Sequence, residues 1–214
     1  MFGIKKIHPV KCREAAISPK VKLFNGVKVP VEVSARHCHL SKADLQKLFG
    51  AGHELTKIKQ LSQPSDFACE ETVDVQAGSK KFEKVRIVGP VREQTQVEIS
   101  LTDAVGSGVL APVRLSGDLK GSSPVVLRGP AGSVELSEGL IIAKRHIHCA
   151  TEKAKKLKLK AGDIVSVQVE GGRAIIFENV IVRTKDDYDF SMHIDTDEGN
   201  AAGINKIGEG YIVK

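Results

Sequence analysis

The chain has 214 residues, 41% of them hydrophobic and 27% charged, which is typical of a globular protein with two small domains or one elaborated domain. Its formal net charge is +6, but the basic residues are scattered and few aromatic residues lie among them, which argues against a nucleic-acid partner. Four cysteines without a C-x-x-C pair argue against a disulfide scaffold or a zinc ribbon. No apolar run approaches the roughly 18 residues that cross a bilayer, and residues 1–20 lack the apolar core of a secretory signal. The composition therefore predicts a cytoplasmic protein without a membrane partner.

The first predicted strand covers residues 29–34, with Val31 and Val33 on one side. A helix then begins after Ser41, whose side chain can cap it, and ends near Gly50 or Gly52. A Lys-rich helix follows Thr151, and a third helix covers about 195–202. Further strands are predicted at 72–76, 85–88, 97–101, 125–127, 134–136, 140–143, 164–169, 174–182 and 190–194. Many short strands with three short helices favour small barrels over a doubly wound sheet.

One unit of the sequence occurs twice. Residues 33–40 contain Arg-His-Cys-His and lead into the first helix, and residues 142–148 contain Arg-His-Ile-His and lead into the Lys-rich helix. The units stand 109 residues apart, as 146 minus 37 shows. The repetition predicts one supersecondary element used twice, with two related half-sites facing each other.

The two His-x-His pairs are the strongest chemical signal in the chain. On an extended strand, residues i and i+2 project from the same face about 7 Å apart, so two imidazoles can converge on one cation. The residue between them points the other way and is expected to pack in a core. Seven His residues predict only about 0.2 such pairs by chance. Two pairs inside a repeated unit therefore indicate a metal site, although buried or surface histidines remain the alternative.

Two further residues complete the candidate ligand set. His193 lies on a predicted strand that runs into an acidic turn, and Glu98 lies between β-branched neighbours. Imidazoles with one carboxylate suit zinc, and three protein ligands leave a position open for chemistry. We expect one metal at His37, His39 and Glu98, and the other at His146, His148 and His193. A single metal with spare histidines is the alternative.

The remaining histidines and cysteines are expected to be structural. His8 lies in a basic arm and His53 in a Gly-flanked turn. Cys38, Cys69 and Cys149 are predicted to be small buried hydrophobic residues, although thiolate ligands are the alternative.

Two residues are candidates for binding an anion. Arg92 follows a Gly-Pro turn at the mouth of the strand that carries Glu98, where a guanidinium can grip an oxyanion. Its alternative role is a surface ion pair with Glu93. Ser116 could add a hydroxyl near a phosphate, and the alternative for residues 114–117 is a simple turn.

At these residues the chain resembles the PduL-type phosphotransacylases, also called phosphate propanoyltransferases. The matching stretches are Val33-Ser-Ala-Arg-His-Cys-His-Leu-Ser41, Leu61-Ser-Gln-Pro64 with Phe67-Ala68, Arg86-Ile-Val-Gly-Pro-Val-Arg92, Thr95-Gln-Val-Glu-Ile-Ser100, Ala143-Lys-Arg-His-Ile-His148 and His193-Ile-Asp-Thr-Asp-Glu-Gly-Asn-Ala-Ala202. They occur in order over nearly the whole chain after residue 29.

The resemblance implies a mainly β fold of two small six-stranded β-barrels capped by short α-helices, with a two-zinc active site between them. It implies a crossed threading in which 29–39 and 139–214 form barrel one and 40–138 form barrel two, after an N-terminal arm of 1–28. It also implies the two ligand sets given above and a role for Arg92 in binding phosphate.

The chain departs from the family pattern at Ser65-Asp66, where Gly-Gln is expected, and this leaves the role of Asp66 open. Many relatives use an N-terminal extension to enter a bacterial microcompartment, so residues 1–20 are the candidate targeting segment. A second copy of this chain and a microcompartment shell are the candidate macromolecular partners.

The predicted reaction is the reversible conversion of an acyl-CoA and phosphate into acyl phosphate and coenzyme A. The acyl-CoA is propanoyl-CoA or acetyl-CoA. No Ser-His or Cys-His nucleophile pair is evident, which favours direct transfer over an acyl-enzyme. The alternatives are a zinc-dependent acyl-CoA thioesterase or hydrolase, and a binding module in which metals only stabilise the barrels.

Overall fold

The computed structural model describes residues 26–213, so the predicted N-terminal arm of 1–28, with its candidate targeting segment, lies almost wholly outside the described residues. The helices of this part of the chain are α1 (Lys42–Phe49), α2 (Leu101–Ser107), α3 (Thr151–Leu157) and α4 (Thr196–Ala202). The strands are β1 (Val27–Ser34), β2 (His37–His39), β3 (Lys57–Gln60), β4 (Phe67–Ala77), β5 (Lys80–Gly89), β6 (Gln96–Ile99), β7 (Val113–Arg114), β8 (Ser123–Arg128), β9 (Ser133–Ala143), β10 (His146–Cys149), β11 (Ile164–Val169), β12 (Ile175–Thr184), β13 (Ser191–Asp195) and β14 (Ile207–Val213). Between residues 26 and 213, no helix has the length and apolar character needed to cross a bilayer.

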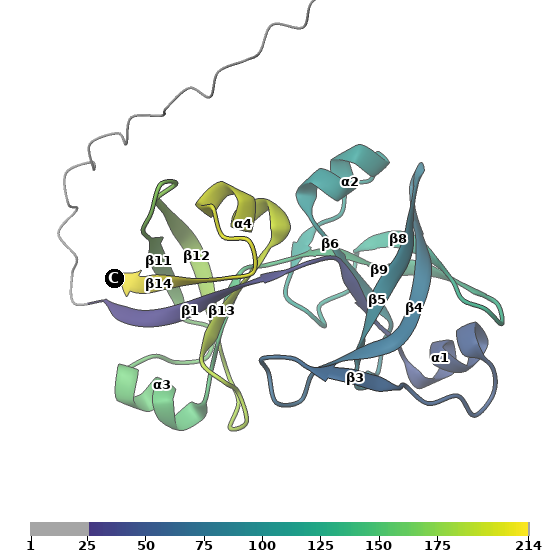
Figure 1. The fold of residues 1–214 in the computed structure, drawn as a ribbon, viewed down its shortest axis with the longest axis horizontal. Coiled ribbons are helices and arrows are strands. Elements are labelled where there is room, and N and C mark those ends of the chain that lie inside the picture. Colours follow the sequence, from purple (N-terminus) through teal and green to yellow (C-terminus); the bar gives the residue numbers. More distant parts are fainter. Residues whose placement is uncertain (1–25, 214) are drawn as a thin grey trace, which may run out of the picture.

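Two β-barrels stand side by side and confirm the predicted fold class (Figure 1). The first closes in the order β1-β13-β10-β12-β11-β14. In the second, β8 pairs with both β4 and β9, which closes the ring β4-β5-β2-β6-β9-β8, with β3 and β7 at its margins. Because each ring is closed, neither barrel leaves a long unpaired edge.

The chain crosses between the barrels twice. Strand β1 is parallel to β13 and antiparallel to β14, both from the C-terminal half, and the chain then passes to β2 in the other barrel. In return, β9 pairs with β6 and β8 before the chain passes to β10. The predicted ranges placed 29–39 and 139–214 in one barrel, whereas the hydrogen bonds place β2 and the whole of β9 in the barrel of the central segment.

Each barrel has its own core of aliphatic residues. Val29, Ile147 and Met192 are fully buried in the first barrel, and Cys38, Leu127 and Leu140 are fully buried in the second. The predicted alternation of apolar residues is visible in β4, where every second residue from Cys69 to Ala77 is buried. Burial of these side chains is the main force that holds each ring together.

The predicted strands are present, with two corrections. Residues 134–136 and 140–143 belong to one strand, β9, and not to two. Leu101 does not end a strand; it begins α2, a fourth helix where we expected three. The Ser100 side chain caps this helix by accepting from the Asp103 N–H, and Gly108 ends it in a left-handed conformation. The predicted capping of α1 by Ser41 has the same pattern.

The two barrels repeat one arrangement of strands. Strand β2 lies between β5, parallel to it, and β6, antiparallel to it; β10 lies in the same way between β12 and β13. Strands β5 and β12 also share a local distortion, since Lys84 and Asn179 both adopt a left-handed conformation, at φ values of 53° and 57°. The repeat seen in the sequence therefore extends over most of each barrel.

The arginines that precede the His-x-His pairs hold the two crossings in place. Arg36 forms a two-pronged ion pair with Asp103 of α2, at 2.9 and 2.7 Å, and Arg145 donates to Glu198 of α4 at 2.9 Å. Both acids are the third residue of a helix that follows a strand facing the site. A charge-assisted pair at this position fixes where each crossing enters the next strand.

A close approach of backbone at Gly129 gives a test of this packing. The carbonyl oxygen of Leu48, at the end of α1, accepts from the Ala131 N–H at 2.9 Å, and a Cβ on Gly129 would overlap that oxygen. We expect Gly129→Ala to lower the free energy of unfolding by about 1–3 kcal/mol, because backbone must shift. Urea unfolding measures this. Gly172→Ala is the matched control, since no atom lies within 4 Å of its added Cβ; equal losses for both variants would contradict the packing.

Candidate metal centre and active site

One pocket of about 590 Å³ lies between the barrels and is lined by residues of both. This volume is within the range of small-molecule sites. All eight predicted site residues line it: His37, His39, Arg92, Glu98, Ser116, His146, His148 and His193. The pocket therefore collects, from four strands and two loops, every residue for which the sequence predicted a chemical role.

The His-x-His pairs lie on strands as expected. In β2 the two imidazoles face the pocket, while the intervening Cys38 is fully buried in the core of the second barrel. In β10 the intervening Ile147 is fully buried in the core of the first barrel. The alternation of a strand thus sends both histidines of each pair to the same side.

The first group consists of His37, His39 and Glu98, whose candidate donor atoms lie within 4.8 Å of one another. His37 and Glu98 are directly opposite on the antiparallel strands β2 and β6, with Nε2 3.6 Å from Oε2. Nδ1 of His37 lies 2.9 Å from the Ala35 carbonyl oxygen, and Nδ1 of His39 lies 2.8 Å from that of Val88. A carbonyl only accepts, so each Nδ1 carries the proton and each Nε2 keeps its lone pair for a metal.

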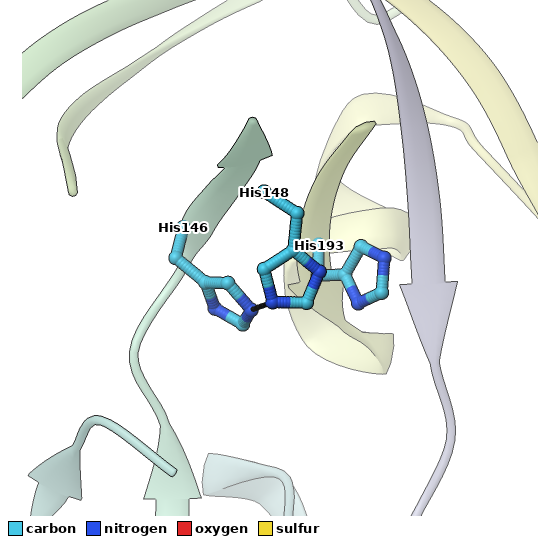
Figure 2. A group of neighbouring side chains, drawn as sticks. All are labelled: His146, His148 and His193. Atoms are coloured by element: carbon cyan, nitrogen blue, oxygen red, sulfur yellow. Dashed lines mark hydrogen bonds between the residues drawn. The ribbon is translucent and has the colours of Figure 1, made fainter. Parts of the chain in front are cut away.

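The second group consists of His146, His148 and His193, again with donor atoms within 4.8 Å (Figure 2). His146 is opposite His193 on β10 and β13, as His37 is opposite Glu98. Nδ1 of His146 donates to the Lys144 carbonyl at 2.8 Å, so its Nε2 keeps a lone pair. That atom is 3.1 Å from Nε2 of His148, close to the roughly 3.3 Å that separates two nitrogens on one tetrahedral zinc.

The second group also contains an unsatisfied atom. Nδ1 of His148 is buried, and it is the only buried side-chain nitrogen or oxygen between residues 26 and 213 without a hydrogen-bond partner. A buried polar atom of this kind is costly unless something binds nearby. The two facing Nε2 atoms and the three clustered imidazoles give the second group the donors for a cation, and the Nδ1 atom is a buried polar position in the same group that is open to a further partner.

Four of the five imidazoles of the site are held neutral by their surroundings. Burial lowers the pKa of His146 to about 4 and that of His148 to about 2, and the neighbouring imidazoles add to both shifts. Burial likewise lowers the pKa values of His39 and His193. Only a neutral imidazole has a lone pair for a metal, so near neutral pH these side chains are in the form that binds one.

Glu98 is the one carboxylate in the two groups. Burial acts to raise its pKa, but the neighbouring His37 side chain and a hydrogen bond from Ser116 act in the opposite direction, and the pKa of Glu98 is lowered overall. Gln96 also donates to its Oε1. The first group therefore carries a negative charge that the second lacks, and the two half-sites differ in charge although they occupy equivalent positions.

Arg92 and Ser116 lie next to each other in the pocket. The Arg92 Nη1 donates to Ser116 Oγ at 2.8 Å, and Gln96 Nε2 donates to the same oxygen at 2.6 Å. Among the salt bridges between residues 26 and 213, none involves Arg92, so the alternative of an ion pair with Glu93 is not seen. An arginine without an acidic partner in a pocket is available to an anionic ligand.

Sequence reasoning missed several residues that line the pocket. Arg183 lies opposite His148 on the adjacent parallel strand, and Tyr188 stacks on the His148 ring with centroids 4.3 Å apart. Gln63 also lines the pocket. The alternation of β6 could have identified Gln96, since it is two residues from Glu98, but nothing local marks Arg183 or Tyr188. Asp66 lies in the pocket wall as well, and its role remains open.

The other histidine and cysteines in the described range have structural surroundings. His53 Nε2 lies 2.9 Å from a carboxylate oxygen of Glu71, away from the pocket. The thiols of Cys38, Cys69 and Cys149 are buried, and burial raises the pKa of each, that of Cys69 to about 11. Protonated thiols are neither metal ligands nor nucleophiles. His8 lies outside the described residues.

Comparisons with known proteins define the class of this chain. The family model for phosphate propanoyltransferase matches residues 30–205. Similar proteins of that name occur in Thermotoga maritima, 49% identical over 86% of this chain and 88% of the relative, and in Enterococcus faecalis, 48% identical over 86% and 87%. A third, from Lachnoclostridium phytofermentans, is 50% identical over 84% of each chain. These matches define an acyltransferase. The chain belongs to the phosphate propanoyltransferase family.

Proposed function

We propose that this chain catalyses, at two zinc ions, the reversible reaction of a short-chain acyl-CoA and phosphate to give acyl phosphate and CoA. The short-chain acyl-CoA is propanoyl-CoA or acetyl-CoA. His37, His39 and Glu98 would hold one ion, and His146, His148 and His193 the other. The observation that carries the proposal is one pocket in which two donor groups converge beside an arginine without an acidic partner. That combination suits a reaction between a thioester and an anion.

The chemistry of the metals follows from the donors. Bound zinc would keep the CoA sulfur as a thiolate and draw electrons from the acyl carbonyl. Glu98 lowers the positive charge of its half-site, which favours release of a thiolate from it, whereas the three neutral imidazoles leave the other half-site more positive, which favours an oxygen anion.

Arg92 would bind and orient phosphate. In the forward direction a phosphate oxygen attacks the thioester carbonyl carbon, a C–O bond forms, the C–S bond breaks, and the sulfur leaves as the thiolate, which solvent later protonates. The planar Arg92 guanidinium can contact two phosphate oxygens at once and offset the charge that grows on the tetrahedral centre. Ser116 accepts one Arg92 N–H and thereby limits the directions in which the guanidinium points.

Direct transfer without an acyl-enzyme is the version that the side chains support. Ser116 Oγ contacts Arg92 and Gln96 but no histidine among the described contacts. In the Ser-His contact between Ser191 and His193, at 3.1 Å, the Ser191 side chain is buried and is not among the residues that line the pocket. The buried thiols are protonated. A nucleophile with a base beside it and access to the substrate is therefore missing from the described part of the chain.

Isotope exchange tests the reaction and its order. We expect CoA release from propanoyl-CoA only when phosphate is present, and no exchange of labelled CoA into propanoyl-CoA without phosphate. Release without phosphate would indicate the alternative, a zinc-dependent thioesterase or hydrolase, which the family match does not favour. Exchange without phosphate would indicate an acyl-enzyme. Acetyl-CoA and butyryl-CoA in the same assay give the acyl preference.

The N-terminal residues and the oligomeric state bear on where the enzyme works. We infer a cytoplasmic enzyme, and residues 1–20 are the segment to test for entry into a bacterial microcompartment. Fusion of these residues to a fluorescent protein in a cell that makes microcompartments gives the test, and diffuse fluorescence would argue against targeting. Gel filtration of the full chain tests for a homodimer.

A further inference from the structure

Gln63 is buried, with 1% of its surface exposed, although its side chain has two donor hydrogens and an acceptor oxygen. It lies in the turn between β3 and β4, within a stretch, 61–64, that the proposed reaction leaves unexplained. Its Nε2 donates to the Asp189 carbonyl and to Ser191 Oγ, both at 3.1 Å, and its Oε1 accepts from the Asp189 N–H at 3.2 Å. Every one of these partners belongs to the other barrel.

The orientation of the Gln63 amide is fixed by these contacts. The Asp189 N–H can only donate and the Asp189 carbonyl can only accept, so the amide oxygen must face the first and the amide nitrogen the second. The remaining Nε2 hydrogen then points at Ser191 Oγ. In a flipped amide the NH₂ group would face the Asp189 N–H, and the amide oxygen would face the Asp189 carbonyl oxygen. Both contacts would be repulsive inside a buried interface, which is costly.

The Ser191 hydroxyl contacts both Gln63 and His193 and so connects them. The Ser191 Oγ lies 3.1 Å from His193 Nε2, and a hydroxyl oxygen has two lone pairs, one for Gln63 and one for a ring N–H. The same Nε2 lies 4.0 Å from a carboxylate oxygen of Glu32 on β1, away from His146 and His148 (Figure 2). A carboxylate beside Nε2 favours the tautomer with the proton on that nitrogen, in which His193 Nδ1 keeps the lone pair for a cation.

We propose that Gln63 is a positioning residue: from the second barrel it holds Ser191, and through Ser191 it fixes the ring plane and tautomer of His193 in the first. The inference rests on the proposed function only in requiring that the second group binds a divalent metal. The first group needs no such bridge, because His37 and His39 donate to the carbonyls of Ala35 and Val88 in their own half of the site. Loss of Gln63 should therefore affect one group and spare the other.

The test is metal binding by the full-length Gln63→Met variant, measured by Zn²⁺ titration against a competing chelator and by the Co²⁺ absorption spectrum. Met has a similar length but makes none of the three hydrogen bonds. We expect one of two sites to weaken by about 10–100-fold, the usual effect of removing an outer partner of a ligand, and the other to be unchanged. Gln76→Met is the matched control, since Gln76 Nε2 donates only to Gly78 of its own barrel among the described contacts.

A second variant keeps the test decisive if Gln63→Met folds poorly. Ser191→Ala removes the bridging hydroxyl but leaves the Gln63 contacts with Asp189, and we expect the same selective weakening. If Gln63 acts through Ser191, the double variant is no weaker than the weaker single variant. If the Zn²⁺ affinities of both sites in either single variant stayed within twofold of those in the wild type, the inference would be overturned. Two intact metal sites in a wild type that shows no phosphate-dependent CoA release would instead overturn the proposed reaction and leave this inference standing.

Discussion

Replacing His146 by Ala should remove one bound metal ion from each chain and slow phosphate-dependent CoA release by more than about 100-fold. His146 supplies a donor with a free Nε2 and lies opposite His193, so the variant leaves its group with two ligands. Loss of an outer partner alone typically costs 10–100-fold in metal affinity or activity, and loss of the ligand itself should exceed that. His37→Ala should remove the other ion, and the double variant should retain neither.

Metal analysis and a thiol-release assay on the same samples measure both effects. His53→Ala is the control, because it removes an imidazole that contacts Glu71 away from the pocket. It should lower stability, since Glu71 is buried, but keep both ions and the activity. Full activity in the double variant would refute the proposed centre, and loss of both ions in each single variant would indicate one shared site.

The ligand residues could be predicted because their signal is local. The alternation of a strand places His37 with His39 and His146 with His148, whatever the rest of the fold does. The fully buried Cys38 and Ile147 between them follow from the same rule. The capped start of α1 at Ser41 is local as well.

The partners of these pairs depend on contacts that local pattern does not encode. Glu98 comes to His37, and His193 to His146, through the register of antiparallel strands joined by long connections. The residue types marked Glu98 and His193 as candidate ligands, and the resemblance implied the same two sets. Gln63 illustrates the limit, because its partners lie 126 residues away, and a glutamine in a turn gives no sign that it will be buried.

Helix α2 was missed for another reason. Leu101 and Val105 extend the apolar pattern of the strand before them, although both are exposed in the structure. The Ser100 cap and the acid three residues later repeat the pattern at Ser41 and Asp44, which we had used for α1. Giving the capping signal more weight than the apolar run would have placed the fourth helix.

Replacing Arg92 by Ala should lower kcat by about 100–1,000-fold and raise the KM for phosphate, with little change in the KM for the acyl-CoA. The Arg92 guanidinium touches Ser116 and has no acidic partner among the described salt bridges, so its charge is available to phosphate. The Ala variant removes that charge from this side of the pocket. Arg92→Lys should recover part of the rate, because an ammonium keeps the charge but cannot hold two phosphate oxygens in one plane.

Steady-state kinetics with phosphate varied at saturating propanoyl-CoA separates the two constants. Arg114→Ala is a matched control, since Arg114 lies on β7 and does not line the pocket. Both Arg92 variants should keep two metal ions, which distinguishes loss of phosphate binding from collapse of the centre. If Arg92→Ala changed the KM for phosphate by less than threefold at full metal occupancy, phosphate would have to be held by another cation, and Arg183, beside His148 in the same pocket, would be the residue to replace next.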